Sequence, residues 1–479
     1  MLAWRVGTLY RPERAFLSHC RTSRGPCSEI ELKQVQWPKI IEHKMLHKGG
    51  EPKTIEPSRL SRKIPCAATK QGATSTYQVK APNATMKFRI ALHLLLLISV
   101  LRLTSQCSVD GDCEYNGVCH GSVCACFSGW SGETCGALNV APASLANSRL
   151  WPVQRAISDS SASAWGFSAP LFDASDGLFH AFSTVACGSD GVVGSGGGNS
   201  FIAHLVSRSP ESGWSLHAAF TPQTTFGPMS ATASDGTFAV IFRVNVLLNS
   251  TACAGSGTDP MPPSFLASSE IPASSLQSGD PEAGTSIYIA SATRAAGPWA
   301  VHRVNITGAG DLHKSNPSIE QLPDGRWAMA YRYNPKGGSL NAVAIADELP
   351  GPYRCVANVT AGKPGDEDPF FWYANVTSGN NPPTPTDQIM GHMLYHNRNF
   401  GYHAFGPLDG TAQWRVGGGH AFVLNVTMDD GSTTFLNRRE RPVLRFDAKT
   451  RKPIALINGV QNATSTGHCF SFEQPIVVS

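Results

Sequence analysis

Six of the thirteen cysteines of this 479-residue chain lie between positions 107 and 135. A segment this short buries too little apolar surface to fold unaided, so cross-links must hold it together. Six cysteines can form disulfides in fifteen ways, and cysteines at such short spacing can instead bind zinc. The cluster predicts a small cross-linked module built on Cys107, Cys113, Cys119, Cys124, Cys126 and Cys135.

The end of this cluster carries a more specific pattern. Cys124-Ala-Cys126 is followed by Phe-Ser-Gly-Trp-Ser-Gly-Glu-Thr and Cys135, which closely resembles the end of an EGF-like domain. The resemblance covers residues 107–136 and implies the disulfides Cys107–Cys119, Cys113–Cys124 and Cys126–Cys135. Ser105-Gln106 stands where calcium-binding EGF-like domains carry acidic residues, so the resemblance implies no calcium here.

A basic stretch with Lys87 and Arg89, an apolar run over 90–101 and a polar end at 104–106 follow Met86. This order is typical of a secretory signal peptide. The alternative is a membrane anchor over 90–104, but the run is shorter than the roughly 20 residues of a membrane span and contains His93. We expect residues 86–106 to be a signal peptide and the chain to be secreted. Residues 1–85 are then a disordered extension or the product of a mis-assigned start codon.

Charge changes along the chain. Residues 1–85 hold fifteen Lys and Arg against six Asp and Glu, and the whole chain has a formal net charge of +4. From Gln106 onward there are twenty-one Lys and Arg against twenty-nine Asp and Glu, a net charge of −8. Nucleic-acid binding needs a clustered basic surface, so the acidic exported part argues against a nucleic-acid partner.

Between 142 and 479, short apolar stretches alternate with Gly, Pro, Asp and Ser turns, which is typical of an all-β fold. An internal repeat lies beneath this pattern. Its first marker is a strand entry, often with proline, then an Asp-Gly turn and an apolar strand, with copies near 165, 226, 316 and 368. Its second marker is a strand and a polar turn closed by an aromatic residue, at Trp214, Trp299, Tyr353 and Trp414.

Four such units and a fifth beginning near Gly417 predict four-stranded blades arranged radially, because radial repetition leaves only short, protected sheet edges. A β-sandwich is the alternative, but it would not explain two markers that recur in the same order. The expected fold is all-β: a five-bladed β-propeller over 150–479, preceded by the small disulfide-rich module.

The order of these units resembles the five-bladed propeller of furanosidase-type glycoside hydrolases, the arabinanase and β-xylosidase group. It is most similar to eukaryotic members that carry an N-terminal EGF-like domain. The resemblance covers about 150–479 and implies a glycan or cell-surface polysaccharide as partner, while the EGF-like module could bind a protein partner. The chain has no glycine-rich phosphate loop and no Cys/His spacing typical of a metal site, so we expect no cofactor and no metal ion.

Glycoside hydrolysis usually needs two carboxylates. The family places its general acid as a Glu two residues before the proline that opens the fourth blade, which is the position of Glu367 before Pro369. Asp366 and Asp368 would raise the pKa of Glu367 by like-charge repulsion, as suits an acid. The alternative is an acidic surface turn that opens a strand.

The other blades depart from the family where their first strands begin. The family's catalytic base is an Asp in the first blade, but the segment Ala164–Ser168 holds no carboxylate. The family's third-blade Asp is matched by the stretch His313-Lys314-Ser315-Asn316, and the second blade begins at the uncharged Phe226-Gly227-Pro228. Two functions therefore remain: a hydrolase with an incomplete carboxylate set, and a non-catalytic glycan-binding or adhesion protein with the EGF-like module as spacer.

Other polar and aromatic residues are candidates for sugar binding. His420 falls at the expected start of the fifth blade, where the family often has a His near a central ion, although a His beside glycines can be structural. Arg439 and Arg441 would share one face of a strand with Glu440 opposite, and could bind a uronic-acid carboxylate or bridge acidic neighbours. The candidate substrate-binding residues are Trp165, Asn316, Asp368, His420, Arg439 and Arg441, where Trp165, like Trp372, could equally be a core aromatic.

Six Asn-x-Ser/Thr triplets fit a secreted glycoprotein; they begin at Asn249, Asn305, Asn358, Asn375, Asn425 and Asn462. Four cysteines remain in the propeller and can pair in three ways. We assign Cys187–Cys253 and Cys355–Cys469.

Overall fold

The computed structural model describes residues 107–144, 148–151, 162–186, 200–221, 225–245, 285–308, 314–334, 339–359, 366–376, 388–397, 400–462 and 469–478. The expected extension and signal peptide, Cys187, Cys253 and the triplet at Asn249 lie outside these residues. Across the described residues, no helix is long and apolar enough to cross a bilayer.

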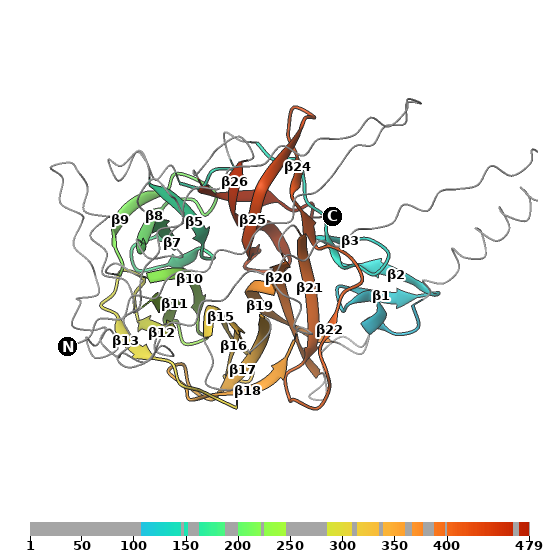
Figure 1. Ribbon diagram of the computed structural model, residues 1–479, viewed down its shortest axis with the longest axis horizontal. Helices are drawn as coiled ribbons and strands as arrows, with labels where there is room; N and C mark the ends of the chain where they lie inside the picture. The colour runs from blue at the N-terminus through green and yellow to red at the C-terminus, as the bar shows by residue number, and fades with distance from the viewer. Residues whose placement is uncertain are drawn as a thin grey trace, which may run out of the picture. The chain divides into compact units, whose positions relative to one another are not determined.

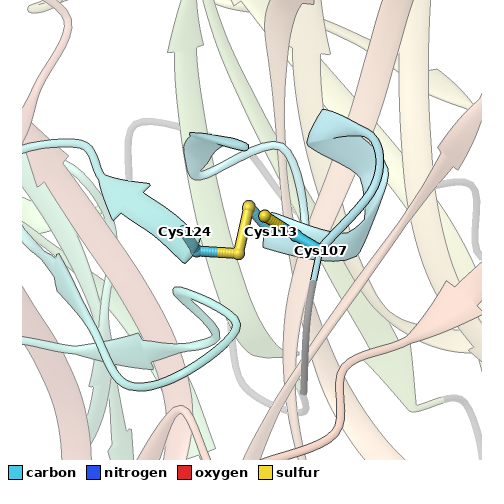
Figure 2. A group of neighbouring side chains, drawn as sticks. All are labelled: Cys107, Cys113 and Cys124. Carbon is cyan, nitrogen blue, oxygen red and sulfur yellow. A yellow bond between two sulfur atoms is a disulfide. The ribbon is translucent and has the colours of Figure 1, made fainter. Parts of the chain in front are cut away.

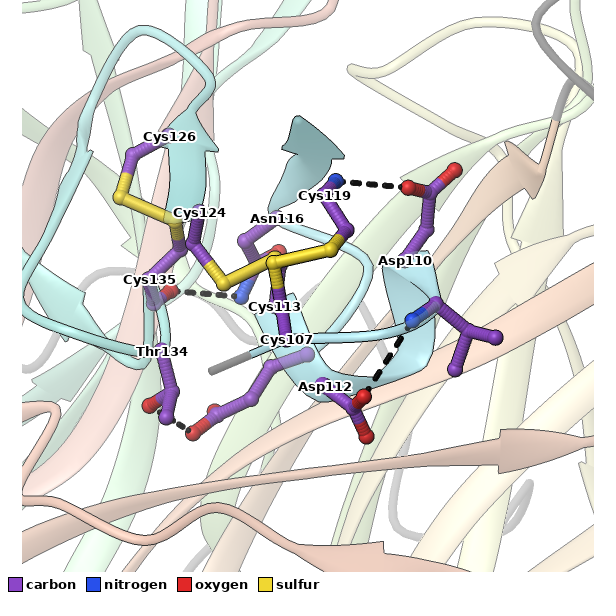
Figure 3. Close-up of a disulfide and its surroundings, with 12 residues drawn as sticks. Cys107, Asp110, Asp112, Cys113, Asn116, Cys119, Cys124, Cys126, Thr134 and Cys135 are labelled. Carbon is purple, nitrogen blue, oxygen red and sulfur yellow. Dashed lines mark hydrogen bonds between the residues drawn. A yellow bond between two sulfur atoms is a disulfide. The ribbon is translucent and has the colours of Figure 1, made fainter. Parts of the chain in front are cut away.

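The N-terminal part is a disulfide-stapled module, residues 107–138. It contains one 3₁₀ turn and two short hairpins: η2 (Asp110–Cys113), β1 (Gly117–His120), β2 (Val123–Cys126), β3 (Trp130–Ser131) and β4 (Ala137–Leu138). The three predicted disulfides are confirmed. Hydrogen bonds supplement them, because Asp110 accepts from the Cys119 N–H and Asn116 donates to the Cys135 carbonyl (Figure 3).

The zinc alternative for this cluster is wrong. Cys107, Cys113 and Cys124 lie close together (Figure 2) because two disulfides sit side by side. Each of the three sulfurs is bonded to another cysteine, and a metal ligand must be a free thiolate.

Five antiparallel sheets make up the rest of the described chain. The first two are β5 (Ser163–Phe167), β6 (Leu171–Asp173), β7 (Leu178–Ala186), β8 (Ser200–Ser207) and β9 (Ser215–Ala219); then β10 (Thr225–Thr232), β11 (Phe238–Asn245), β12 (Thr285–Ala292) and β13 (Ala300–Arg303). The third is β14 (Ile306–Thr307), which is parallel to β18, with β15 (Lys314–Gln321), β16 (Trp327–Tyr333), β17 (Leu340–Ala346) and β18 (Tyr353–Asn358). The last two are β19 (Asp366–Val376), β20 (Gln388–Asn397), β21 (Phe400–Pro407), β22 (Arg415–Val416) and β23 (Phe422–Val423); then β24 (Asn425–Thr427), β25 (Thr433–Phe446), β26 (Pro453–Asn462) and β27 (Cys469–Pro475).

The sheets follow one another round a common centre (Figure 1), with the inner strands β5, β10, β15, β19 and β25 each in contact with the next. The last sheet returns to the first, since the Cys469 N–H donates to Ser163 Oγ and Ser471 Oγ donates to the Gly166 carbonyl. The predicted all-β fold, a five-bladed β-propeller behind a small disulfide-rich module, is confirmed.

Both repeat markers have a physical role in the blades. In the predicted Asp-Gly turns, the aspartate side chain accepts the backbone N–H two residues later, as Asp176, Asp235 and Asp324 do, which is the Asx-turn geometry that reverses a chain locally. The closing aromatics are all buried. Trp299 of blade 2 packs edge-on against Phe182 and Phe220 of blade 1, and Trp214 packs against Phe167 of its own blade.

Every inner strand contains the same backbone irregularity. At one residue φ is positive and the register with the second strand shifts, which defines a β-bulge. These five residues, the bulge residues, are Gly166 (φ 74°), Gly227 (66°), Asn316 (50°), Asp368 (54°) and Arg441 (52°). In blades 2 to 5 a proline follows the bulge residue, so the prolines seen in the sequence mark the bulge rather than the start of a strand.

The expected start of the fifth blade near Gly417 is wrong. The short strands β22 and β23 on either side of this glycine-rich segment both pair with β21, so the segment is a loop of blade 4. The fifth blade begins with β24, and its bulge lies at Arg441-Pro442. The assigned disulfide Cys355–Cys469 is also wrong: Cys355 carries a free thiol, and β18 and β27 belong to different blades.

Candidate functional site

Two further sets of residues lie next to the bulges. The residue before each bulge residue pairs with a residue on the second strand of its blade. In blade order these pairs are Trp165 with Thr184, Phe226 with Arg243, Ser315 with Arg332, Glu367 with His396, and Glu440 with Gly459. Blades 1 and 2 therefore contribute no carboxylate, and the acidic groups gather on blades 4 and 5.

A buried ion-pair network forms the base of this centre. Arg441 Nη2 lies 3.2 Å from Asp368 Oδ1 and donates to Asn316 Oδ1 at 3.1 Å. His396 Nε2 lies 3.0 Å from the second carboxylate oxygen of Asp368. All four residues are at most 5% exposed. Arg441 thus links the bulge residues of blades 3 and 5 by a charged hydrogen bond, which is stronger than a neutral one, and those of blades 4 and 5 by an ion pair.

This network sets opposite pKa shifts on its two titrating members. Burial raises the pKa of Asp368, but the Arg441 guanidinium and the His396 hydrogen bond outweigh burial and hold it well below its usual range. Burial lowers the pKa of His396, but the hydrogen bond to Asp368 and its charge raise it above the ordinary value. Asp368 is therefore the fixed negative charge of the centre.

Glu367 differs from its neighbour Asp368. Its carboxylate accepts a hydrogen bond from Arg332 Nη1 at 2.6 Å, and its side chain is 33% exposed. Burial raises the pKa of Glu367, the charge of Asp368 raises it further, and Arg332 opposes both. Burial is the larger cause, where the sequence suggested like-charge repulsion alone. The result is a reachable carboxyl group with a raised pKa beside an ionised one.

Arg441 fills the side of the centre that faces blades 1 and 2. Its guanidinium lies 4.2 Å from the centre of the Phe226 ring, in cation–π contact. A Cβ placed on Gly166 would come within 2.7 Å of Arg441 Cδ, and one on Gly227 would overlap its guanidinium. Both positions require glycine because Arg441 occupies this space. Because Arg441 fills this space, the bulge of blade 1 has no room for a carboxylate side chain.

Three of the six candidate sugar-binding residues meet in this centre, namely Asn316, Asp368 and Arg441. His420 does not: it is exposed on the blade-4 loop, stacked on Phe400 at 4.0 Å between ring centres. Trp165 is 2% exposed and packs within the core, so it has no free face for a sugar. Trp372 is buried against Trp130 of the disulfide module, which makes it a core aromatic.

Arg439 points away from the centre, contrary to the expectation that it shares a face with Arg441. It donates to Asn458 and Gln474 of blade 5 and to the Val423 carbonyl of blade 4. Strict alternation fails here because the bulge at Arg441 turns that side chain inward. Glu440 and Arg438 are the pair that share a side, 2.7 Å apart.

Sequence reasoning missed Arg243, Arg332, His396 and the part played by Glu440. The first three lie on second strands, opposite the residue before each bulge. A signal was present, because Arg243 and Arg332 interrupt otherwise apolar strands, and charged residues are rarely buried without partners.

Glu367, Asp368 and His396 also place three ligand atoms within 4.8 Å of one another. The Asp368 carboxylate is already bound by Arg441 and His396, and a divalent cation would be repelled by the Arg332 and Arg441 guanidiniums. The donor set therefore suits an ion-pair network better than a metal centre.

No protein-family model matches the chain, and no curated protein matches its sequence. Among solved structures it is similar to fructan 1-exohydrolase IIa from Cichorium intybus, with 10% identity and a TM-score of 0.42, over 70% of this chain and 57% of that one. It is also similar to xylan β-1,4-xylosidase from Bacillus halodurans (12%, 0.39, 65% and 53%) and to α-L-arabinofuranosidase from Lactobacillus brevis (10%, 0.39, 64% and 90%). The chain thus spans little more than half of the first two.

Proposed function

We propose that this protein is a secreted, carbohydrate-active propeller that binds an extracellular glycan at its centre and hydrolyses it with Glu367 as general acid. The centre offers charged groups that remain partly exposed, Glu367, Arg332 and Arg438, above a buried ionic base. Such groups can hydrogen-bond sugar hydroxyls. The confirmed disulfides support export, because disulfides persist in oxidising compartments.

The position and surroundings of Glu367 carry this proposal. A general acid needs a raised pKa and must be able to reach the leaving oxygen. Burial and the charge of Asp368 raise the pKa of Glu367, and a third of its side chain is accessible. Arg332 fixes the carboxyl group at the residue before the blade-4 bulge, so the proton is presented from a rigid strand.

The test uses the chain from Gln106 to Ser479, produced with its disulfides formed, on a panel of aryl glycosides and polysaccharides. We expect product release by the parent and a loss of about 10²- to 10⁴-fold in the Glu367→Gln variant. Aryl glycosides with good leaving groups need little protonation, so the variant should retain more activity on them than on polysaccharides. Equal activity of parent and variant on a polysaccharide would exclude Glu367 as the acid.

One observation favours a second candidate, a non-catalytic glycan-binding protein. Arg441 fills the space where the family's blade-1 base would stand. If the protein is a non-catalytic glycan-binding protein, the parent should bind glycans on an array and release no product from any of them. The disulfide module would then act as a spacer or as a contact for a protein partner.

A further inference from the structure

A Glu-x-Pro motif occurs twice at the centre of the propeller: Glu367-Asp368-Pro369 in β19 and Glu440-Arg441-Pro442 in β25. The middle residue has nearly the same φ in both, 54° and 52°. In both strands the register shifts directly after the glutamate. The two glutamates therefore occupy equivalent positions in adjacent blades.

The two motifs are joined through their middle residues. Asp368 and Arg441 lie 3.2 Å apart, and each is bonded in sequence to one of the glutamates. Glu367 and Glu440 thus flank a single buried ion pair. His396, which hydrogen-bonds Asp368, lies within electrostatic range of both glutamates, and the charge of Glu440 also reaches Glu367.

Each glutamate has its own arginine, but the surroundings differ. Glu440 Oε1 lies 2.7 Å from Arg438 Nε, and its side chain is 10% exposed, against 33% for Glu367. The more exposed Glu367 can reach a leaving oxygen, and the more enclosed Glu440 lies at the equivalent position of the neighbouring blade. Together they supply the two carboxylates that glycoside hydrolysis needs.

We propose that Glu440 is the second catalytic carboxylate, replacing the absent blade-1 base, and this rests on the hydrolysis proposed above. In the step, the Glu367 carboxyl group gives its proton to the glycosidic oxygen while the bond between that oxygen and the anomeric carbon breaks. A water oxygen bonds to the anomeric carbon and its proton passes to the Glu440 carboxylate. Proton exchange with solvent then restores both groups.

The experiment compares Glu440→Gln with Glu473→Gln. Glu473 is a matched control, since it is a buried glutamate of the same blade, 2.7 Å from Arg445, on the outermost strand β27. We expect kcat to fall about 10²- to 10⁴-fold in Glu440→Gln and to stay near the parent value in Glu473→Gln.

Chemical rescue separates a catalytic role from a structural one. Azide or formate should restore turnover to Glu440→Ala, because a small anion can replace the missing base, but not to Glu367→Ala acting on polysaccharides. A Glu440→Gln variant as active as the parent overturns the role of Glu440 and leaves hydrolysis standing. If the parent binds glycans without turnover, the catalytic role of Glu440 is overturned and glycan recognition stands. If the parent shows no binding and no turnover, both proposals are overturned.

Discussion

At the scale of single residues, the Asp368–Arg441 pair organises the centre. Both side chains are 3% exposed, and they belong to different blades. Removing one partner from a buried pair leaves an uncompensated charge, which costs far more than the pair itself contributes. These two residues should therefore matter to stability whatever the protein binds.

We expect Arg441→Gln to lower the free energy of unfolding by about 3–5 kcal/mol, because it leaves Asp368 ionised and buried. Adding Asp368→Asn should recover part of this loss. Arg451→Gln is the control, since Arg451 pairs with Glu320 while half exposed, and such pairs contribute about 0–1 kcal/mol. Urea unfolding with intact disulfides measures all three. Equal losses for Arg441→Gln and Arg451→Gln would contradict the buried network.

At the scale of elements, the bulge of the inner strand is the repeated device of this fold. The bulge residue is glycine in blades 1 and 2 and a polar or charged residue in blades 3, 4 and 5. The two glycine bulges give Arg441 its space. The glycines of blades 1 and 2 thus make room for the arginine side chain of blade 5.

Gly227→Ala tests this dependence. The variant must accept a Cβ in the left-handed region, at about 1–2 kcal/mol, and must also displace the Arg441 guanidinium. Gly236→Ala isolates the first cost, since its φ is +85° and nothing lies within 4 Å of the added Cβ. We expect Gly227→Ala to be less stable than Gly236→Ala by a further 1–3 kcal/mol or so in urea unfolding. Similar losses would mean that Arg441 does not fill this space.

At the scale of the whole molecule, the disulfide module packs on blade 4 through a polar relay. Glu114 is buried; its carboxylate lies 2.8 Å from His403 Nδ1 and accepts from Thr134 and the Gly418 N–H. His403 Nε2 lies 3.0 Å from His392 Nδ1. Trp130 stacks on Trp372 beside this relay. The module thereby packs against the propeller through buried polar and aromatic contacts.

The relay predicts acid sensitivity. Burial raises the pKa of Glu114, but the hydrogen bond and charge of His403 outweigh it and lower the pKa below the ordinary value. A carboxylate with a lowered folded pKa stabilises the fold above its unfolded pKa of about 4.3, and this contribution is lost as pH falls through the folded value. Hydrogen-exchange protection of the module should therefore fall below about pH 4 in the parent.

Glu114→Gln should show lower protection at neutral pH and less change on acidification. Glu133→Gln, at an exposed position of the same module, should behave like the parent. Protection factors, corrected for the intrinsic exchange rate at each pH, make the comparison. An unchanged acid response in Glu114→Gln would assign the sensitivity to another group.

Much of the architecture could be predicted because its signals are local. The Asp-Gly turns and the closing aromatics depend on residues a few positions apart and recur in order, and the disulfides join cysteines 9 to 12 positions apart. The order of the blades also led to the proposal of Glu367 as the acid. The start of the fifth blade was predicted too early in the sequence, because the glycine-rich segment Gly417–Gly419 resembles the start of a blade. The bulge of this blade lies at Arg441-Pro442.

The amino-acid sequence by itself determined the stapled module and the all-β repeat, since short-range covalent and turn chemistry specifies both. Only the tertiary structure decided which charges meet. Arg441, Asp368, Asn316 and His396 come from separate strands, and a bulge of one residue reverses the face that strand alternation predicts. The separation of Arg439 from Arg441, the burial of Trp165 and the pairing of two Glu-x-Pro motifs all follow from that non-local geometry.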